Sequence, residues 1–400
     1  MHPHLPTIID EREGEGKSRV AYFVLRISYS VKVGMMSRMR IGIDARLTYY
    51  TRGGIAYYIR QIVQHIPPLD PHNDYFILHS WKAKENLGTK RINCFTPAHH
   101  RFERLALGVE MIPPRLDLLH SPDFIPPHGA FKKVITIHDL AFLHYPNYLT
   151  PDSRRYYHDQ IRDAASRAEA IITVSESARA DVINLLNVPA EKIETIYEAP
   201  DSKFRPLPKE NVEAVTMRLG IPNRYLLFVG TFEPRKNVDG LIRAYATIKD
   251  APPLVIAGNK GWLFEETFKL VHDLKLERCV HFIQNVSPDD IVPLYNAALA
   301  LVLPSHYEGF GFPVLEAFAC GVPVIISNRA SLPELANGSA LICDPDDLVS
   351  IAYTIQQVMN DSQLRKTLIE KGFKRVKDFS WGKCARETLE VYRKMLEVER

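Results

Sequence analysis

Clustered cysteines and histidines are missing from this sequence. The five cysteines are scattered between Cys94 and Cys384, and none of them forms a Cys-x-x-Cys motif. This spacing indicates neither a zinc site nor a disulfide framework. We therefore expect a protein of the reducing cytoplasm that holds no metal ion.

Long apolar runs and an excess of one charge are missing as well. The longest apolar run near the start, Val20–Leu25, is much shorter than a membrane-spanning helix. The sequence thus predicts no signal peptide and no transmembrane helix. Its 50 Lys and Arg residues balance 47 Asp and Glu residues, which gives a net charge of +3. A chain this close to neutral has no overall field that would attract nucleic acid.

What remains is the composition of a globular protein. Of the 400 residues, 46% are apolar and 24% are charged, and the length favours two domains or one large domain. Residues 1–38 have no clear periodicity, and three methionines, Met35, Met36 and Met39, precede a strong predicted strand. We interpret 1–38 as a disordered extension or as the product of a start codon assigned too far upstream.

From Arg40 onward, short apolar runs alternate with amphipathic segments of helical length. This alternation is typical of a parallel sheet covered by helices, so the predicted fold class is α/β. The predicted helices include Ile55–Ile66, Ser153–Arg167 and Glu176–Leu186. The predicted strands are Arg40–Ala45, Tyr75–His79, Leu118–His120, Lys133–His138, Ala170–Val174, Tyr225–Gly230, Leu254–Ala257, Val280–Phe282, Leu299–Leu303 and Val324–Ile326.

A proline-rich segment, Ala199–Pro208, separates two halves of the same kind. Its three prolines and weak apolar periodicity are typical of a connection between domains. The sequence therefore predicts an N-terminal domain at 39–205, a C-terminal domain at 206–379 and a last helix within 380–400, from Lys383 to about Glu399. Two such domains leave a cleft at the carboxyl ends of their strands, where open parallel sheets bind ligands.

The longest polar motif joins the predicted strand Leu299–Leu303 to a predicted helix. Glu308-Gly-Phe-Gly-Phe-Pro313 is followed by Glu316 one turn into that helix. The two glycines let backbone N–H groups approach a ligand, and the proline suits a first helical turn. Such a helix start attracts phosphate, and the two carboxylates suit sugar hydroxyls. The structural alternative is a tight turn flanked by solvated glutamates.

Polar residues also follow other predicted strands. Arg235 and Lys236 stand in the Gly-Thr-Phe-Glu-Pro-Arg-Lys-Asn turn after Tyr225–Gly230, where they would neutralise a diphosphate. Arg52-Gly53-Gly54 follows the first strand, but the Gly-x-Gly-x-x-G of dehydrogenases is absent there. His138-Asp139 follows another apolar strand. Taken singly, each motif is also explained as a solvated turn or a structural histidine.

Together these segments resemble glycosyltransferase family 4, the retaining sugar-nucleotide transferases of GT-B fold. The resemblance rests on the Glu308-x7-Glu316 motif, the Arg235-Lys236 turn, the two-glycine loop, the His138-Asp139 pair and Thr173-Val-Ser-Glu. It extends from about Arg40 to the C-terminus and is nearest to bacterial mannosyltransferase-like members. It implies two Rossmann-like domains facing across a cleft, with a C-terminal helix that returns to the N-terminal domain.

The resemblance also implies roles for individual residues. Arg235 and Lys236 are expected to bind the donor diphosphate, Glu316 the ribose, and Glu308 and His138 the transferred sugar. The expected catalytic residues are thus Glu308, His138, Arg235 and Lys236. The expected donor-binding residues are Gly53, Gly54, Arg235, Lys236, Glu308, Gly309, Phe310, Gly311, Phe312, Pro313 and Glu316.

The reaction that the resemblance implies is retaining transfer of a hexose to a glycan or a lipid-linked glycan. Mannose from GDP-mannose is the first choice of donor, and a UDP-hexose is the second. No Asp-x-Asp triplet stands in a suitable place, and two cations can replace Mg²⁺, so we expect metal-independent transfer without a cofactor. The acceptor is expected on the N-terminal domain. Basic residues there form either a solvated surface or a patch for peripheral contact with the inner face of a membrane; they are Arg101, Arg104, Arg115, Lys132 and Lys133.

Three other functions fit part of the pattern. A GT-B phosphorylase would need a lysine that binds pyridoxal phosphate, and a sugar-nucleotide 2-epimerase shares the fold. Neither explains the Glu308-x7-Glu316 helix as well as a transferase does. An inactive sugar-nucleotide-binding module would leave the full set of polar residues without a catalytic role.

Overall fold

The computed structural model describes residues 38–397 except 89, 101, 147–150 and 260–263. Within this part of the chain, Arg40–Arg400 form one unit that contains two parallel sheets. The expectation of a disordered extension at 1–38 falls outside the described residues, apart from Arg38.

The first sheet belongs to the N-terminal half. Its strand order is β3-β2-β1-β4-β5-β6-β7, and every neighbouring pair is parallel. Order reverses between β1 and β4, which is where doubly wound sheets open toward a ligand. The strands are β1 (Arg40–Asp44), β2 (Asp74–Ser80), β3 (Lys90–Cys94), β4 (Leu118–Ser121), β5 (Lys132–Ile137), β6 (Ala170–Thr173) and β7 (Ile193–Thr195).

The second sheet repeats this scheme in the C-terminal half. Its order is β10-β9-β8-β11-β12-β13, again parallel throughout and reversing between β8 and β11. The strands are β8 (Tyr225–Val229), β9 (Leu254–Ala257), β10 (Val280–Ile283), β11 (Ala298–Leu303), β12 (Val324–Ser327) and β13 (Leu341–Cys343).

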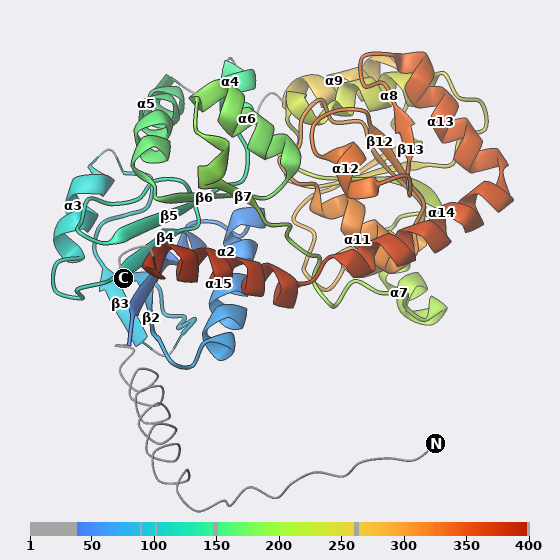
Figure 1. Cartoon of the computed structure of the whole chain (residues 1–400). Coiled ribbons are helices and arrows are strands. Elements are labelled where there is room, and N and C mark those ends of the chain that lie inside the picture. Colours follow the sequence, from blue (N-terminus) through green and yellow to red (C-terminus); the bar gives the residue numbers. More distant parts are fainter. Residues whose placement is uncertain (1–37, 89, 101, 147–150, 260–263, 398–400) are drawn as a thin grey trace, which may run out of the picture. The chain divides into compact units, whose positions relative to one another are not determined.

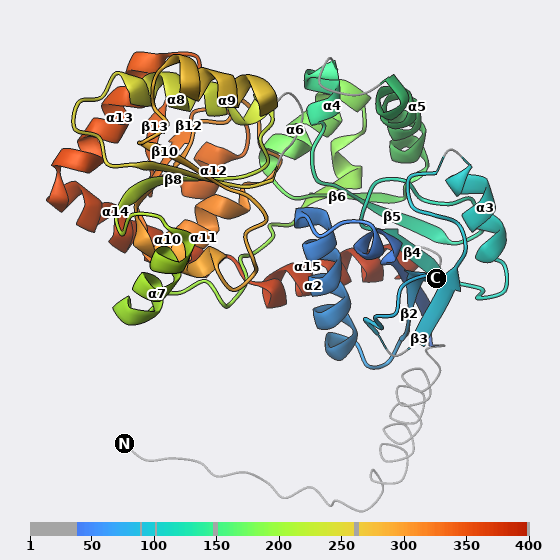
Figure 2. The same ribbon diagram turned by 180° about the vertical axis from the view of Figure 1, so that it is seen from behind.

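Helices lie on both faces of each sheet, as Figure 1 and Figure 2 show. They explain why the central strands read as continuous apolar runs, because a strand covered on both faces buries every side chain. β4, β6, β9 and β12 are buried along their whole length. The helices are α2 (Gly54–Leu69), α3 (Glu103–Glu110), α4 (Ala141–His144), α5 (Pro151–Arg167), α6 (Glu176–Leu186), α7 (Lys209–Leu219), α8 (Val238–Ala246), α9 (Phe264–Asp273), α10 (Ile291–Ala297), α11 (Phe312–Cys320), α12 (Leu332–Ala336), α13 (Leu348–Asn360), α14 (Ser362–Arg375) and α15 (Trp381–Glu397).

The predicted fold class, two parallel-sheet α/β halves, is confirmed, and each of the ten predicted strands matches a strand of the structure. β3, β7 and β13 were not predicted. They are edge strands, and β7 and β13 have only three residues each. Short edge strands carry little hydrophobic pattern, because one side of their backbone is unpaired.

The last helix returns to the N-terminal half, as the resemblance implies. Trp381, at the start of α15, packs edge-on against Tyr57 of α2, with ring centroids 5.5 Å apart. Tyr392, further along α15, is fully buried and lies 2.6 Å from the Nδ1 atom of His120 in β4. α15 therefore belongs to the core of the N-terminal half although it is the last element in sequence. The predicted end of this helix, Glu399, lies outside the described residues.

No helix in the described part of the chain is both long enough and apolar enough to span a membrane.

Candidate active site

The loop after β11 holds a buried carboxylate. Glu308 is 5% exposed, and its two oxygens each lie 2.6 Å from the ammonium of Lys236. The hydroxyl of Ser305 donates a third hydrogen bond to the same carboxylate at 2.8 Å. Burial alone would raise the pKa of Glu308, but the charges of Lys236 and Arg235 outweigh it and lower the pKa below the usual range. Glu308 is therefore ionised at neutral pH.

The turn after β8 supplies the two cations. Arg235 donates to the backbone carbonyl of Tyr307 at 3.1 Å and to Glu308 at 3.4 Å. The backbone of His306 donates in return to the carbonyl of Arg235 at 2.8 Å. Burial lowers the pKa of Lys236, and the neighbouring Glu308 offsets only part of that shift. Two loops that are about 70 residues apart in sequence thus form one charged cluster at adjacent strand ends, which we call the Lys236–Glu308 cluster (Arg235, Lys236, Ser305, Glu308).

The two-glycine segment between Glu308 and α11 makes close contacts across the halves. A Cβ atom on Gly309 would lie 2.3 Å from the carbonyl oxygen of His138, so only glycine fits there. The hydroxyl of Ser175, after β6, donates to the carbonyl of Gly309 at 2.7 Å. Gly311 has a φ of 112°, a backbone conformation that favours glycine, and it caps α11, whose first turn contains Pro313 as predicted.

His138 stands directly after β5 with both ring nitrogens occupied. Nε2 donates to the carbonyl of Pro122 at 2.9 Å, and Nδ1 lies 3.2 Å from Oε1 of Glu198, which is 1% exposed. Burial alone would lower the pKa of His138, but the pairing with Glu198 outweighs it and raises the pKa. The structure therefore stabilises a positive charge on His138, next to the Gly309 loop.

The Gly53-Gly54 loop lies beside the start of α11. Gly53 is the N-cap of α2, and a Cβ atom on Gly54 would be 3.3 Å from the ring of Phe312. Tyr57, one turn further along α2, packs edge-on against Phe312 at 5.9 Å. This brings the N-terminus of α2 to the N-terminus of α11. Phe310 is buried and packs edge-on against Phe312, with ring centroids 5.2 Å apart.

Glu316 lies one turn into α11 and is partly buried. The hydroxyl of Tyr295, in α10, donates to its carboxylate at 2.6 Å. Burial raises the pKa of Glu316 to about 7, and the Tyr295 hydrogen bond offsets only part of this effect. Its carboxyl group is thus balanced between the two protonation states near neutral pH.

The structure brings Arg235, Lys236 and Glu308 together at adjacent strand ends, with His138 beside the Gly309 loop. Glu316 instead contacts Tyr295 of α10. The structure also adds three residues that the sequence did not reveal. Glu198 pairs with His138, Ser305 orients Glu308, and Tyr307 donates to Asp181 of the other half at 2.6 Å. Ser305 and Tyr307 were within the motif but carried no signal of their own. Glu198 lies between β7 and the proline-rich connection, two strands away from β5 in the sheet, so no short segment of the sequence links it to His138.

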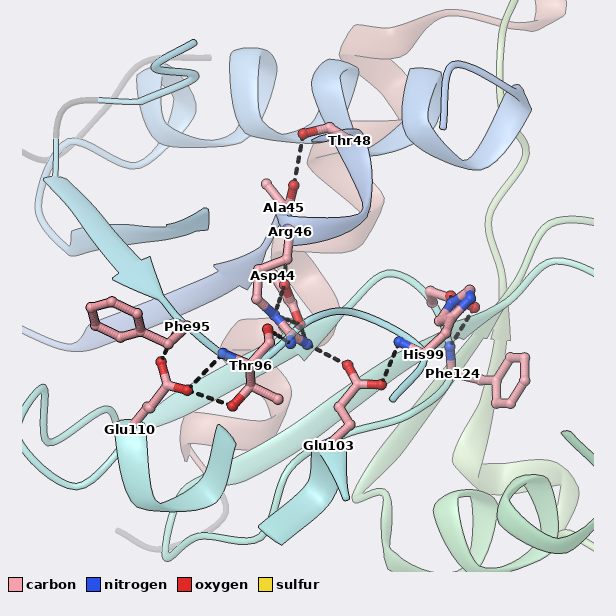
Figure 3. A network of polar contacts seen from close by, with 11 residues as sticks. Asp44, Ala45, Arg46, Thr48, Phe95, Thr96, His99, Glu103, Glu110 and Phe124 are labelled. Carbon is pink, nitrogen blue, oxygen red and sulfur yellow. Dashed lines mark hydrogen bonds and ion pairs between the residues drawn. The ribbon is translucent and has the colours of Figure 1, made fainter. Parts of the chain in front are cut away.

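A separate polar network lies in the N-terminal half (Figure 3). Arg46 is 1% exposed. It forms ion pairs with Asp44, the last residue of β1, and with Glu103 of α3. Glu103 also accepts from the backbone N–H of His99 at 2.8 Å, and Arg46 donates to the carbonyl of Thr96 at 2.9 Å. A buried arginine with two carboxylate partners fixes the loops at the carboxyl end of β1.

Comparison with known families agrees with this geometry. Residues 218–375 match the family model "Glycosyl transferases group 1", and residues 52–203 match "Glycosyltransferase Family 4". The O-antigen chain mannosyltransferase B of Escherichia coli is 35% identical over 281 residues, covering 69% of this chain and 74% of the relative. The serotype-specific mannosyltransferase WbdA of Escherichia coli is 28% identical over 277 residues, but this chain covers only 34% of its length.

Solved structures share the fold at low sequence identity. Alr3699/HepE of Anabaena, solved in complex with UDP and glucose, superposes with a TM-score of 0.72 at 17% identity, covering 89% of this chain and all of that chain. At this identity the similarity establishes the fold alone. The family models, the 35% identical relative and this shared fold together show that the chain belongs to glycosyltransferase family 4 and is a GT-B glycosyltransferase related to mannosyltransferases.

Proposed function

We propose that this enzyme transfers mannose from GDP-mannose, with retention of configuration, to a growing glycan or lipid-linked glycan in the cytoplasm. The observation that carries the proposal is the Lys236–Glu308 cluster, which lies against the Gly309 loop and His138 of the other half. The 35% identical relative is a mannosyltransferase, which supports mannose as the sugar.

The cluster suits a leaving group with a double negative charge. Lys236 pairs with Glu308 at 2.6 Å, and Arg235 pairs with Glu233 at 2.8 Å and with Glu308 at 3.4 Å, so both cations are oriented at the strand ends. A donor diphosphate would share these cations with Glu308, and the N-terminus of α11 would add backbone N–H groups. Cations held in place before the reaction stabilise negative charge as the diphosphate departs, and they need no reorganisation to do so.

The remaining residues are assigned to the donor in the same way. Glu316 would accept hydrogen bonds from the ribose hydroxyls, and the backbone from Gly309 to Pro313 would contact the sugar and phosphates. His138 would face the transferred sugar, and Gly53-Gly54 would close on the diphosphate from the other half. These assignments place the nucleotide on the C-terminal half and the acceptor on the N-terminal half.

Same-face attack is the mechanism that the charges favour. Both oxygens of Glu308 accept from Lys236 at 2.6 Å, and a carboxylate held in this way is a weak nucleophile. A double displacement through Glu308 would have to break that pair. In same-face attack, an oxygen of the departing phosphate takes the proton of the acceptor hydroxyl, so charge and protons balance without an enzyme carboxylate.

A peripheral membrane contact fits the surface of α3. Apolar side chains project there to solvent. Among the described basic residues nearby in sequence, Arg115 is exposed, Lys132 and Lys133 are half-buried at the start of β5, and Arg104 pairs with Asp163; Arg101 lies outside the described residues. The exposed side chains are Phe102, Leu105, Val109 and Ile112, each more than half exposed, with Phe95 nearby. Exposed apolar residues among basic ones are typical of surfaces that contact anionic lipid. We therefore include contact with the inner face of a membrane, where a lipid-linked acceptor would reside.

The proposal is tested by measuring nucleotide release from a panel of nucleotide sugars, with and without glycan acceptors. The expected result is acceptor-dependent release of GDP from GDP-mannose. Acceptor-dependent release of UDP from a UDP-hexose instead would replace GDP-mannose as the donor. Conversion of the donor to its epimer without acceptor would indicate an epimerase. Tight nucleotide binding without any turnover would indicate an inactive binding module.

A further inference from the structure

A cavity of about 520 Å³ lies beside α2 in the N-terminal half. This volume is within the range of ligand-binding pockets, roughly 300–1,000 Å³. One wall is a stripe of α2 that contains Tyr57, Gln61, Gln64 and Pro68, residues spaced by three or four positions and therefore on one helix face. The other wall is strand β2 with the segment 85–88 that follows it. We call this cavity the α2 groove.

The α2 groove begins at the proposed active site. Tyr57 lines its first end and also packs against Phe312, the first residue of α11. From there the lining follows α2 to Pro67 and Pro68, near the C-terminal end of the helix. Figure 2 shows α2 running from the region near α11 toward β2. A chain bound in the groove would thus have one end near the donor loop and the other end away from it.

The chemistry of the lining suits a neutral, polyhydroxylated ligand. Its charged side chains are Arg60 and Glu85, and these form an ion pair with each other, so the lining has no net charge. Gln61 and Gln64 make no side-chain hydrogen bond to another described residue, and an amide both donates and accepts, as a sugar hydroxyl does. Tyr57 and the two prolines add apolar faces against which sugar rings can pack.

We propose that the α2 groove binds the glycan chain of the acceptor, several sugar units away from the hydroxyl that reacts. The inference rests on the proposed function for the identity of the ligand. A groove next to the donor loop is expected to bind a glycan only if the enzyme transfers sugar to a glycan acceptor. The absence of net charge distinguishes the groove from the Lys236–Glu308 cluster, which suits phosphate, and from the basic surroundings of α3, which suit anionic lipid.

Binding of α-linked mannopentaose and of mannose to the full chain tests this proposal, with affinities measured by NMR titration. Gln64→Trp fills the groove from an exposed helix position, and Gln61→Ala removes an amide without adding bulk. Gln356→Trp, at an exposed position of α13 in the other half, is the matched control. We expect Gln64→Trp to weaken mannopentaose binding at least about fivefold, the size of one or two lost hydrogen bonds. Gln61→Ala should weaken it less, and Gln356→Trp should leave it unchanged.

Two results would overturn the groove. One is wild-type affinity for mannopentaose in Gln64→Trp and Gln61→Ala, and the other is no binding of mannopentaose to the wild-type chain at about 10 mM. A separate assay of donor consumption distinguishes failure of the proposed function from failure of the groove. If neither GDP-mannose nor a UDP-hexose is consumed but mannopentaose binding still depends on Gln64, the transferase proposal fails and the groove stands. If GDP-mannose is consumed and binding does not depend on Gln64, the groove fails and the transferase proposal stands.

Discussion

Replacing Lys236 by methionine should affect stability and turnover through two separable effects. Lys236 is 9% exposed, and its ammonium is the nearest partner of the buried Glu308 carboxylate. Breaking a buried ion pair by removing one partner typically costs about 3–5 kcal/mol, because the other charge stays buried. Arg235 at 3.4 Å and the Ser305 hydroxyl at 2.8 Å still contact Glu308, so we expect the lower end, about 3 kcal/mol.

A double substitution separates the two effects. Lys236→Met with Glu308→Gln removes both charges of the pair, and Arg235 keeps its ion pair with Glu233 at 2.8 Å, so most of the lost stability should return. Turnover should not return, because the variant lacks both a cation that stabilises the departing diphosphate and the Glu308 carboxylate expected at the transferred sugar; loss of the cation alone typically costs about 100-fold or more. Lys209→Met is the control: Lys209 is 81% exposed, its pair with Glu213 lies on the surface, and the change should cost less than about 0.5 kcal/mol.

The assay is urea unfolding of the four proteins together with nucleotide release at saturating donor. The reasoning predicts a large loss of stability in the single variant, recovery in the double variant and low turnover in both. It would be refuted if Lys236→Met were as stable as the wild type and kept turnover within twofold. Recovery of turnover in the double variant would show that Lys236 acts on stability alone.

Three further predictions follow from other parts of the structure. The ionised form of Glu316 suits the ribose, and its pKa is raised to about 7, so GDP-mannose affinity should fall about tenfold as the pH drops from 8 to 6. Calorimetry should show this dependence in the wild type and not in Glu316→Gln. A flat profile in the wild type would contradict the prediction. EDTA should leave turnover largely unchanged, because Arg235 and Lys236 supply the positive charge; complete loss restored by Mg²⁺ or Mn²⁺ would overturn the cationic account. Val109→Glu on α3 should reduce sedimentation with anionic liposomes at low salt, whereas Val349→Glu, an equally exposed control on α13, should not; equal binding of both variants would argue against the α3 surface.

The sequence predicted the central strands well because they are buried on both faces. Leu254–Ala257 and Val324–Ile326 are uninterrupted apolar runs, and the structure places each within a strand. The edge strand Lys90–Cys94 was missed because three of its five residues, Lys90, Arg91 and Asn93, are polar. An apolar run in the sequence indicates a strand that is buried, and an edge strand is only partly buried, so it lacks such a run.

The site shows the same division between local and long-range information. Glycine spacing and the adjacent cations were visible as motifs, because each depends on a few neighbouring residues. The pairing of Glu198 with His138 joins positions 60 residues apart, and the hydrogen bond from Ser175 to Gly309 joins the two halves. Such contacts depend on the strand order and on how the halves pack, which no short segment encodes. For the same reason, the sequence did not predict that the Lys236 ammonium donates to both carboxylate oxygens of Glu308.

The central claim is retaining transfer of mannose, and the configuration of the product tests it most directly. The full chain is incubated with GDP-mannose and a manno-oligosaccharide, and the new linkage is identified by the one-bond carbon–hydrogen coupling at its anomeric carbon in NMR. The account predicts one added mannose in α linkage, the configuration of the donor, with one GDP released for each linkage formed. A β-linked product would contradict retention, and absence of any product with GDP-mannose and with UDP-hexoses would contradict the transferase reaction itself.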